Sequence, residues 1–126
     1  VEAKTAGNTG LVLIVAFNYG SRAELADAAR HLAREVAAGR LDPEAIDEAA
    51  MTGALYTAGL PDPDLIIRTS GEQRLSNFLL WQSAYAELVF LDCYWPDFDR
   101  RELLKALEIF DSRDRRYGGV VARDAS

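Results

Sequence analysis

The sequence predicts an α/β domain with a parallel sheet and helices on both faces of that sheet. Three apolar runs of strand length, residues 11–17, 64–69 and 88–91, are separated by stretches in which apolar residues recur at helical spacing. The runs are almost continuously apolar, which is typical of strands covered on both faces. Because three strands make a narrow parallel sheet, we expect the N-terminal strands of the sheet to be missing from this chain.

The first part of the chain predicts a helical end, a strand and a long helix. Residues 1–5 have the pattern of the last turn of a helix, and the β-branched residues of the run 11–17 favour a buried strand. Ser21 and Glu24 have the spacing of a capping box. Apolar residues then recur at helical spacing as far as Gly39, so an amphipathic helix is predicted here.

The middle of the chain predicts a second helix and a second strand. Asp42 followed by Pro43 is typical of an N-cap with proline at the first helical position. We expect this helix to end near Gly53 or Gly59. The strand predicted at residues 64–69 then follows a proline-containing turn.

The last part of the chain predicts a helix, a strand and a final helix. Ser76 or Asn77 is expected to cap a helix that runs to residue 85. Residues 88–91 are expected to form the third strand. Asp99, with a glutamate three positions later, predicts the start of the last helix.

The chain reads as part of one domain that covers residues 1–119, with a disordered tail at residues 120–126. It shows no internal repeat, linker or low-complexity tract. It begins with Val1 rather than methionine, and we therefore expect it to be the C-terminal part of a longer protein.

Composition excludes several classes of function. The net charge of −6 argues against a nucleic-acid surface, which needs a basic excess. No apolar stretch is long enough to predict a membrane span. Cys93 is the only cysteine, so neither a disulfide framework nor a cysteine metal cluster is expected, and a reducing cytoplasm is the simplest location. The thiol is expected to be a small buried apolar group rather than a nucleophile.

The strongest candidate site follows the second predicted strand. In open α/β sheets, ligands bind beyond the carboxyl ends of the strands, where loops supply hydrogen-bond donors. Here Arg68, Arg74 and Ser76 bring two guanidinium groups and a hydroxyl, and Gly71 lets the backbone approach a ligand. Arginine binds phosphate oxygens in a bidentate manner, so this set suits a diphosphate. Glu72 lies between the arginines in sequence and would fix their rotamers by ion pairing.

Each candidate also has a purely structural interpretation. Arg68 and Arg74 could form surface ion pairs with Glu72 and Asp64, each contributing about 0–1 kcal/mol. Glu87 could bind a divalent cation, or it could be a solvated carboxylate. Residues 18–22 could line a cleft, but the glycine and arginine among them also fit a tight turn and a first helical turn.

At this point the residues resemble a known family. Residues 63–82 read PDLIIRTSGEQRLSNFLLWQ and are followed by AYAE at 84–87 and WPDF at 95–98. This order closely resembles the signature of the cis-prenyltransferases, which include undecaprenyl diphosphate synthase. The flanking motifs TAGNTG at 5–10, FNYGSR at 17–22 and RRYGG at 115–119 are similar to those of the same family. Ser21 departs from the family pattern, which often has a second glycine there.

The resemblance implies a substrate and a division of labour among these residues. Arg68, Arg74 and Ser76 would hold the diphosphate of isopentenyl diphosphate, with Glu72 beside them. Glu87 would help to place Mg²⁺. Arg116 and Gly118 would reach across a homodimer interface and contribute to the isopentenyl site of the other subunit.

The implied reaction is condensation of isopentenyl diphosphate with an allylic diphosphate such as farnesyl diphosphate. The product would be a cis-polyprenyl diphosphate, a precursor of the lipid carrier for cell-wall synthesis, and its lipid tail would associate the enzyme loosely with membranes. The main catalytic aspartate would lie in an N-terminal part outside this chain, so we expect the chain alone to be inactive. Two other hypotheses stay open, a non-catalytic subunit of a heteromeric cis-prenyltransferase and a simple anion-binding α/β module. An upstream aspartate followed by a glycine-rich loop would distinguish these hypotheses.

Overall fold

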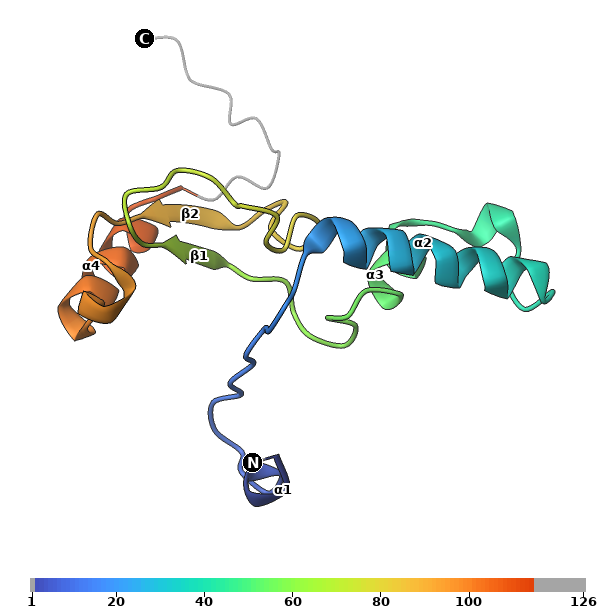
Figure 1. Ribbon diagram of the computed structural model, residues 1–126, viewed down its shortest axis with the longest axis horizontal. Coiled ribbons are helices and arrows are strands. Elements are labelled where there is room, and N and C mark those ends of the chain that lie inside the picture. Colours follow the sequence, from blue (N-terminus) through green and yellow to red (C-terminus); the bar gives the residue numbers. More distant parts are fainter. Residues whose placement is uncertain (1, 115–126) are drawn as a thin grey trace, which may run out of the picture.

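The computed structural model describes residues 2–114 and contains two strands that form a parallel pair (Figure 1). Strand β1 is Leu65–Arg68 and strand β2 is Glu87–Phe90. The Cα of Leu65 lies opposite that of Glu87, and the Cα of Arg68 lies opposite that of Phe90. The helical elements, in chain order, are α1 (Glu2–Thr5), α2 (Ser21–Ala37), η1 (Pro43–Ala45), α3 (Glu48–Gly53), η2 (Trp95–Asp97) and α4 (Arg100–Asp111).

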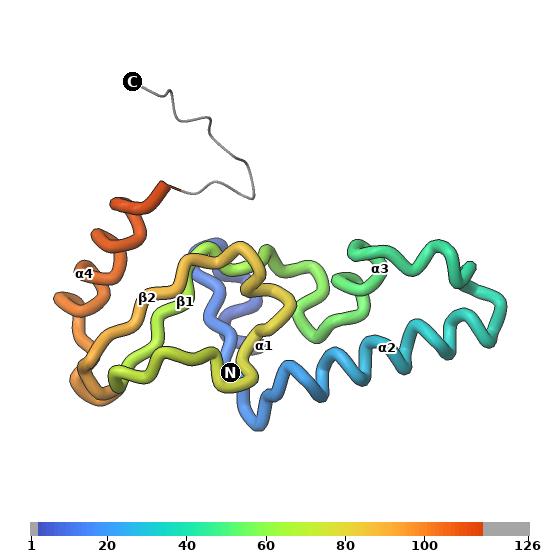
Figure 2. The backbone as a smooth tube through the Cα atoms, turned by 90° about the horizontal axis from the view of Figure 1, so that it is seen from above, coloured from blue at the N-terminus to red at the C-terminus, as the bar shows by residue number. Residues whose placement is uncertain are grey.

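The two strands lie in the middle of an elongated arrangement. Figure 1 and Figure 2 both show α4 at one end and α2 with α3 at the other. Helix α4 packs against β2, and α2 packs against α3. The chain between β1 and β2, residues 69–86, is an irregular crossover that reaches from the sheet to the start of α2. This crossover carries three of the candidate site residues, Glu72, Arg74 and Ser76, and Arg68 comes directly before it.

The core lies between the sheet and α4. Val89, Leu91 and Ala106 are almost fully buried there, and Cys93 is among the partly buried residues that pack against them. Burial raises the pKa of the Cys93 thiol, as expected for the small apolar core residue that the sequence predicted. Asp99 caps α4 by accepting hydrogen bonds from the backbone N–H groups of residues 101 and 102.

Most of the predicted elements are confirmed. The α/β class, the two strands at residues 64–69 and 88–91, the long helix and the last helix are all present within a residue or two. The helix predicted after Asp42 is present as two short pieces, η1 and α3. Asp42 and Asp47 each cap one piece, and the extended backbone at Ile46 and Asp47 separates them. Gly53 ends α3, as predicted.

The prediction of a buried strand at residues 11–17 is wrong for the described structure. The segment has no strand assignment, and its apolar side chains are open to solvent: Leu11 is 93% exposed and Phe17 is 87% exposed. A strand requires a neighbour that accepts and donates its ladder hydrogen bonds. Within residues 2–114 no segment pairs with this one.

The helix predicted to run from Ser76 or Asn77 to residue 85 is also absent, because the crossover is built from turns. Ser76, Asn77 and Leu79 have left-handed backbone angles (φ of +49°, +64° and +46°), which a right-handed helix does not allow. Asn77 does cap a helix, but that helix is α2, 55 residues earlier in the chain. Tertiary hydrogen bonds to α2 therefore replace the local helix.

The capping box predicted for Ser21 and Glu24 is wrong. Gly20 is the N-cap of α2 and makes no side-chain capping bond, and Ser21 is already the first helical residue. The Ser21 hydroxyl instead accepts a hydrogen bond from the Leu80 N–H at 3.0 Å. Glu24 is fully buried and bonds to other segments. Both side chains stabilise tertiary contacts rather than the local helix end.

Within residues 2–114, no helix is both long and apolar enough to cross a lipid bilayer.

Candidate functional site

The candidate anion site begins where β1 ends. Arg68 is the last residue of β1, and the chain then turns sharply with Ser70 and Gly71 at positive φ. The N–H of Ser70 donates to the carbonyl of Cys93 at 2.8 Å, and the N–H of Gly71 donates to the carbonyl of Leu91 at 2.9 Å. These bonds tie the first part of the crossover to the chain that follows β2. The turn is therefore fixed by the chain that leaves the sheet after β2.

Gly71 occupies a position that favours glycine. Its φ is +67°, and an added Cβ would lie 3.2 Å from the Oδ1 atom of Asp92. The expectation that Gly71 lets the backbone approach a ligand stays a prediction.

Glu72 pairs with both arginines of the predicted cluster. Its Oε2 atom accepts from Nη2 of Arg68, and its Oε1 atom accepts from Nη2 of Arg74 at 2.6 Å. The hydrogen bond from Arg68, together with the positive charge of Arg74, holds the pKa of Glu72 below its usual range. The predicted ion pairing is confirmed, and Glu72 is ionised at neutral pH.

The cluster is accessible to a ligand. The side chains of Arg68 and Glu72 are 33% and 35% exposed, whereas that of Arg74 is 63% exposed. Two guanidinium groups and one carboxylate leave a local charge of +1, which attracts an anion. Each guanidinium has five N–H donors, so the bond to Glu72 leaves donors for phosphate oxygens. The cluster therefore has the chemistry of a phosphate-binding site as well as that of a surface ion pair.

Ser76 lies two residues beyond Arg74 in the same crossover and is exposed. Its left-handed φ of +49° is uncommon for a residue with a side chain. The next residue, Asn77, is bonded to the first turn of α2. The crossover thus places Glu72, Arg74 and Ser76 on one segment that is tied down at both ends and begins next to Arg68.

Glu87 does not belong to this cluster. It is the first residue of β2 and lies opposite Leu65, whereas Arg68 lies opposite Phe90. Three residues along a strand span ~10 Å, so the two side chains start from opposite ends of the strand pair. The Oε2 atom of Glu87 accepts from Nη1 of Arg113 at 2.7 Å. Glu87 is therefore neither simply solvated nor joined to the arginine cluster.

A complete metal cage is absent from the described residues. Between residues 2 and 114, no three His, Cys, Asp or Glu side chains lie close enough together to hold a metal ion. Mg²⁺ usually keeps several waters and binds through one or two carboxylates plus the phosphates of a substrate. Glu87, with a side chain that is 24% exposed, fits the part of one such carboxylate.

A second polar cluster, which the sequence interpretation missed, surrounds the buried carboxylate of Glu24. This carboxylate accepts from the Tyr19 hydroxyl, from the Tyr56 N–H at 2.9 Å and from Nε2 of Gln82 at 3.3 Å. Burial, together with the bond to Glu24, raises the pKa of Tyr19. The sequence does contain a signal for the burial of Glu24, because Glu24, Ala28 and Leu32 recur at intervals of four residues and so share the buried face of α2.

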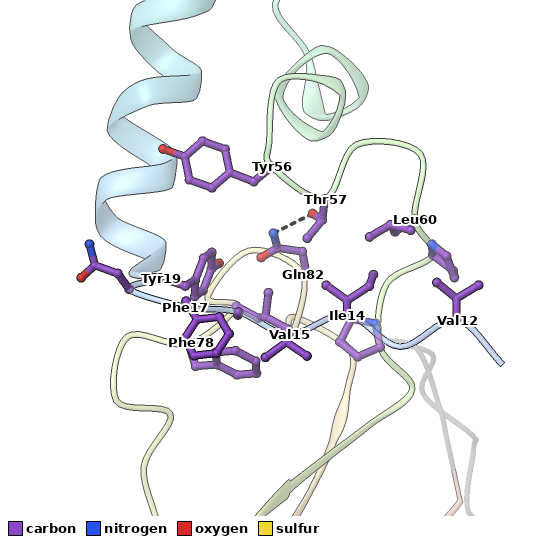
Figure 3. A pocket seen from close by; sticks show the side chains of 15 residues that line it. Val12, Ile14, Val15, Phe17, Tyr19, Tyr56, Thr57, Leu60, Phe78 and Gln82 are labelled. Carbon is purple, nitrogen blue, oxygen red and sulfur yellow. Dashed lines mark hydrogen bonds between the residues drawn. The ribbon is translucent and has the colours of Figure 1, made fainter. Parts of the chain in front are cut away.

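An apolar cavity of about 720 Å³ lies beside the Glu24 cluster (Figure 3). Figure 3 shows Val12 and Ile14, from the segment at residues 11–17, on one side of the cavity and Leu60 on the other. Gln82 lines the cavity and donates to Oγ1 of Thr57 at 2.8 Å. Its own side-chain oxygen is buried and accepts no hydrogen bond from the part of the chain described. The lining suits a hydrocarbon group.

The remaining predicted residues divide into two groups. Of residues 18–22, Asn18 and Tyr19 line the cavity, and Gly20 has the structural role of an N-cap. Arg116 and Gly118 lie outside the described residues.

With this geometry in place, the family of the chain is clear. Residues 1–118 match the family model described as "Putative undecaprenyl diphosphate synthase". The chain belongs to this family, which confirms the resemblance seen in its motifs.

Relatives and a solved structure agree with the family. An isoprenyl transferase of Brucella suis is 61% identical over 122 residues, which are 97% of this chain and 48% of that protein. A trans,polycis-polyprenyl diphosphate synthase of Thermobifida fusca, specific for (2Z,6E)-farnesyl diphosphate, is 63% identical over 119 residues, which are 94% of this chain and 42% of that protein.

The crystal structure of lavandulyl diphosphate synthase from Lavandula x intermedia, in complex with dimethylallyl diphosphate, matches with a TM-score of 0.89 and 43% identity. The match covers 93% of this chain and 50% of that one. The chain therefore spans about half the length of the curated relatives it matches.

Proposed function

We propose that this chain is the isopentenyl-binding part of a cis-prenyltransferase, which condenses isopentenyl diphosphate with an allylic diphosphate such as farnesyl diphosphate. The observation that carries this proposal is the cluster of Arg68, Glu72 and Arg74 at the carboxyl end of β1. Membership of the family supports it, as do the prenyl diphosphate chemistry in the names of the relatives and the ligand of the lavandulyl enzyme.

In this proposal, the arginine cluster binds and orients rather than reacts. The diphosphate of isopentenyl diphosphate takes donors from Arg68 and Arg74 and accepts a hydrogen bond from Ser76. Glu72 pairs with both guanidinium groups and holds them in place before the substrate arrives. The two arginines and Glu72 sum to a charge of +1, which offsets part of the negative charge of the diphosphate, and their fixed positions orient the isopentenyl double bond for attack.

The bond changes of the reaction follow from this placement. The carbon–oxygen bond of the allylic diphosphate breaks, and the leaving diphosphate takes the electron pair. The isopentenyl double bond attacks the allylic carbon, and a proton is then lost to form the new double bond. The allylic site and the main catalytic aspartate are proposed to lie outside this chain, which we expect to be inactive alone.

Mg²⁺ is the proposed cofactor, and Glu87 is the described residue that would help to hold it. When bound, it would neutralise charge on diphosphate oxygens. Arg113 holds one oxygen of Glu87 and so fixes the direction of the carboxylate. We place the reaction in the cytoplasm, because the single cysteine fits a reducing compartment.

The apolar cavity is proposed to contribute to the wall that receives the hydrocarbon chain. Its lining residues Phe78 and Leu79 belong to the same crossover as Arg74 and Ser76. A growing polyprenyl chain would also give the protein a loose association with membranes. Arg116 and Gly118 are proposed to complete the isopentenyl site of the other subunit in a homodimer, and the product is proposed to serve as a lipid-carrier precursor.

Incorporation of labelled isopentenyl diphosphate by the full-length protein tests this proposal. With a farnesyl-type primer and Mg²⁺, we expect labelled polyprenyl diphosphate whose new double bonds are cis by NMR, and we expect none when EDTA is present. A full-length protein that binds isopentenyl diphosphate but elongates no allylic primer would instead favour a non-catalytic subunit. A protein that neither binds nor incorporates it would contradict the assignment of the arginine cluster.

A further inference from the structure

The crossover that carries Arg74 and Ser76 is held by the first turn of α2, although the two segments are more than fifty residues apart in sequence. The Oδ1 atom of Asn77 accepts from the Arg22 N–H at 2.8 Å, and the carbonyl of Asn77 accepts from the Ser21 N–H at 2.9 Å. In return, the Ser21 hydroxyl accepts from the Leu80 N–H at 3.0 Å. Two of the free N–H groups at the start of α2 are thus satisfied by the crossover.

The start of α2 depends on these bonds because its N-cap residue offers only a backbone carbonyl, which accepts from the N–H groups of residues 23 and 24. Gly20 has no side chain to accept a bond. An added Cβ at Gly20 would lie only 2.8 Å from Nδ2 of Asn77, so the absence of a side chain makes room for the asparagine amide. The asparagine therefore takes the place of a local capping side chain.

The backbone of the crossover is strained at this contact. Ser76, Asn77 and Leu79 all have left-handed φ angles, and none of them is glycine. Such angles persist where the surrounding structure over-determines them, and they concentrate at ligand clamps. Here the bonds from Arg22, Ser21 and Leu80 supply that constraint.

The opposite end of the segment is equally fixed. Ser70 and Gly71 are bonded to the chain after β2, and Asn77 is bonded to α2. Glu72, Arg74 and their ion pair lie between these two anchors. A change at either anchor would therefore move the guanidinium group of Arg74 and the hydroxyl of Ser76 together.

We propose that Asn77 is a positioning residue for diphosphate binding: by capping α2 from the crossover, it holds Arg74 and Ser76 in the arrangement that receives the diphosphate of isopentenyl diphosphate. This rests on the function proposed above for the arginine cluster. Asn77 itself touches no reacting atom. It acts through the backbone that joins it to Ser76.

Two substitutions at Asn77 distinguish the effect of its capping hydrogen bond from the effect of its left-handed backbone angle. Asn77→Gly permits the left-handed φ without strain but removes the Oδ1 acceptor. Asn77→Asp keeps an acceptor at the same place, and aspartate is a favoured N-cap. Gly20→Ala approaches the contact from the other side, because it leaves Asn77 intact but displaces its amide. Asp99→Ala is the matched control, since it removes the cap of α4, away from the crossover.

Steady-state kinetics of the full-length protein test the proposal, with the KM for isopentenyl diphosphate measured separately from the KM for the allylic primer. We expect Asn77→Gly and Gly20→Ala to raise the KM for isopentenyl diphosphate about tenfold and to leave that for the primer unchanged, since small displacements of a binding group cost this much or more. Asn77→Asp keeps the acceptor but adds a negative charge near the site, so its KM for isopentenyl diphosphate should lie closer to the wild-type value than that of Asn77→Gly. Asp99→Ala should lower the melting temperature without changing either KM.

Arg74→Ala, measured in the same series, distinguishes the two proposals. If Arg74→Ala raises the KM for isopentenyl diphosphate and Asn77→Gly does not, the positioning role is wrong while the binding cluster stands. If Arg74→Ala itself leaves the KM for isopentenyl diphosphate unchanged, the binding function proposed for the arginine cluster is wrong, and the positioning role that rests on it is wrong as well. A fall in melting temperature with both KM values unchanged in Asn77→Gly would mean that the asparagine only stabilises α2.

Discussion

Replacing Arg68 by alanine in the full-length protein should raise the KM for isopentenyl diphosphate about thirtyfold. Arg68 is the last residue of β1, and its position is fixed by the register with Phe90 and by Glu72. A charge-assisted hydrogen bond contributes roughly 2 kcal/mol, and each 1.4 kcal/mol corresponds to about a factor of ten. The ion pair of Arg68 with Glu72 is partly exposed, and such pairs contribute only about 0–1 kcal/mol, so its loss should lower the melting temperature only slightly.

The assay compares initial rates at varied isopentenyl diphosphate and at varied primer. Arg40→Ala is a suitable control, because Arg40 forms a bidentate ion pair with Glu35 at 2.7 Å and is as exposed as Arg74. If the arginines of the cluster were ordinary surface ion pairs, Arg68→Ala and Arg40→Ala would behave alike. An equal rise in the KM values for both substrates would refute the assignment of Arg68 to the isopentenyl site.

Four further predictions concern charge, metal, assembly and core. Arg68 lowers the pKa of Glu72 in the folded protein, so the stabilisation by this pair is fully present above the usual glutamate range and is lost as the pH falls through the lowered pKa of the folded state. Arg68→Ala should raise the pKa of Glu72 in an NMR titration, and an unchanged pKa would contradict the pairing. Glu87→Gln should raise the Mg²⁺ concentration needed for half-maximal turnover, and an unchanged Mg²⁺ dependence would remove Glu87 from the metal site. In a homodimer, Arg68→Ala and Arg116→Ala subunits, each impaired at isopentenyl diphosphate concentrations below the raised KM, should regain up to about half of native activity per hybrid when they are mixed. No recovery, with hybrids confirmed by native mass spectrometry, would mean that Arg116 acts within its own subunit or has no role in the site. Leu91→Ala, in the core between the sheet and α4, should lower the free energy of unfolding by about 2–5 kcal/mol in chemical denaturation, and a loss below 1 kcal/mol would contradict its packing.

Elements with strong local signals could be predicted from the sequence. The apolar run at β1 and the N-cap at Asp99 before α4 are both where the sequence placed them. The ion pairing of Glu72 with Arg68 and Arg74 also followed from close sequence spacing. In each case the interacting groups are neighbours in the chain or share one regular element.

Features that depend on distant partners could not be predicted in this way. The segment at residues 11–17 has the composition of a strand, but strand formation depends on a neighbour that the described residues do not supply. Asn77 has the propensity of an N-cap, and only the tertiary structure shows that it caps α2 rather than the residues that follow it. The sequence predicts that Glu24 is a local capping residue, whereas its carboxylate accepts from Tyr19, from the turn at Tyr56 and from the crossover.

A crystal structure of the full-length protein with a non-reactive thiolo analogue of isopentenyl diphosphate tests the central claim most directly. The proposed function predicts diphosphate oxygens about 2.7–3.2 Å from guanidinium nitrogens of both Arg68 and Arg74, with the Ser76 hydroxyl on the same group. A diphosphate bound elsewhere, with both arginines still paired only to Glu72, would contradict it.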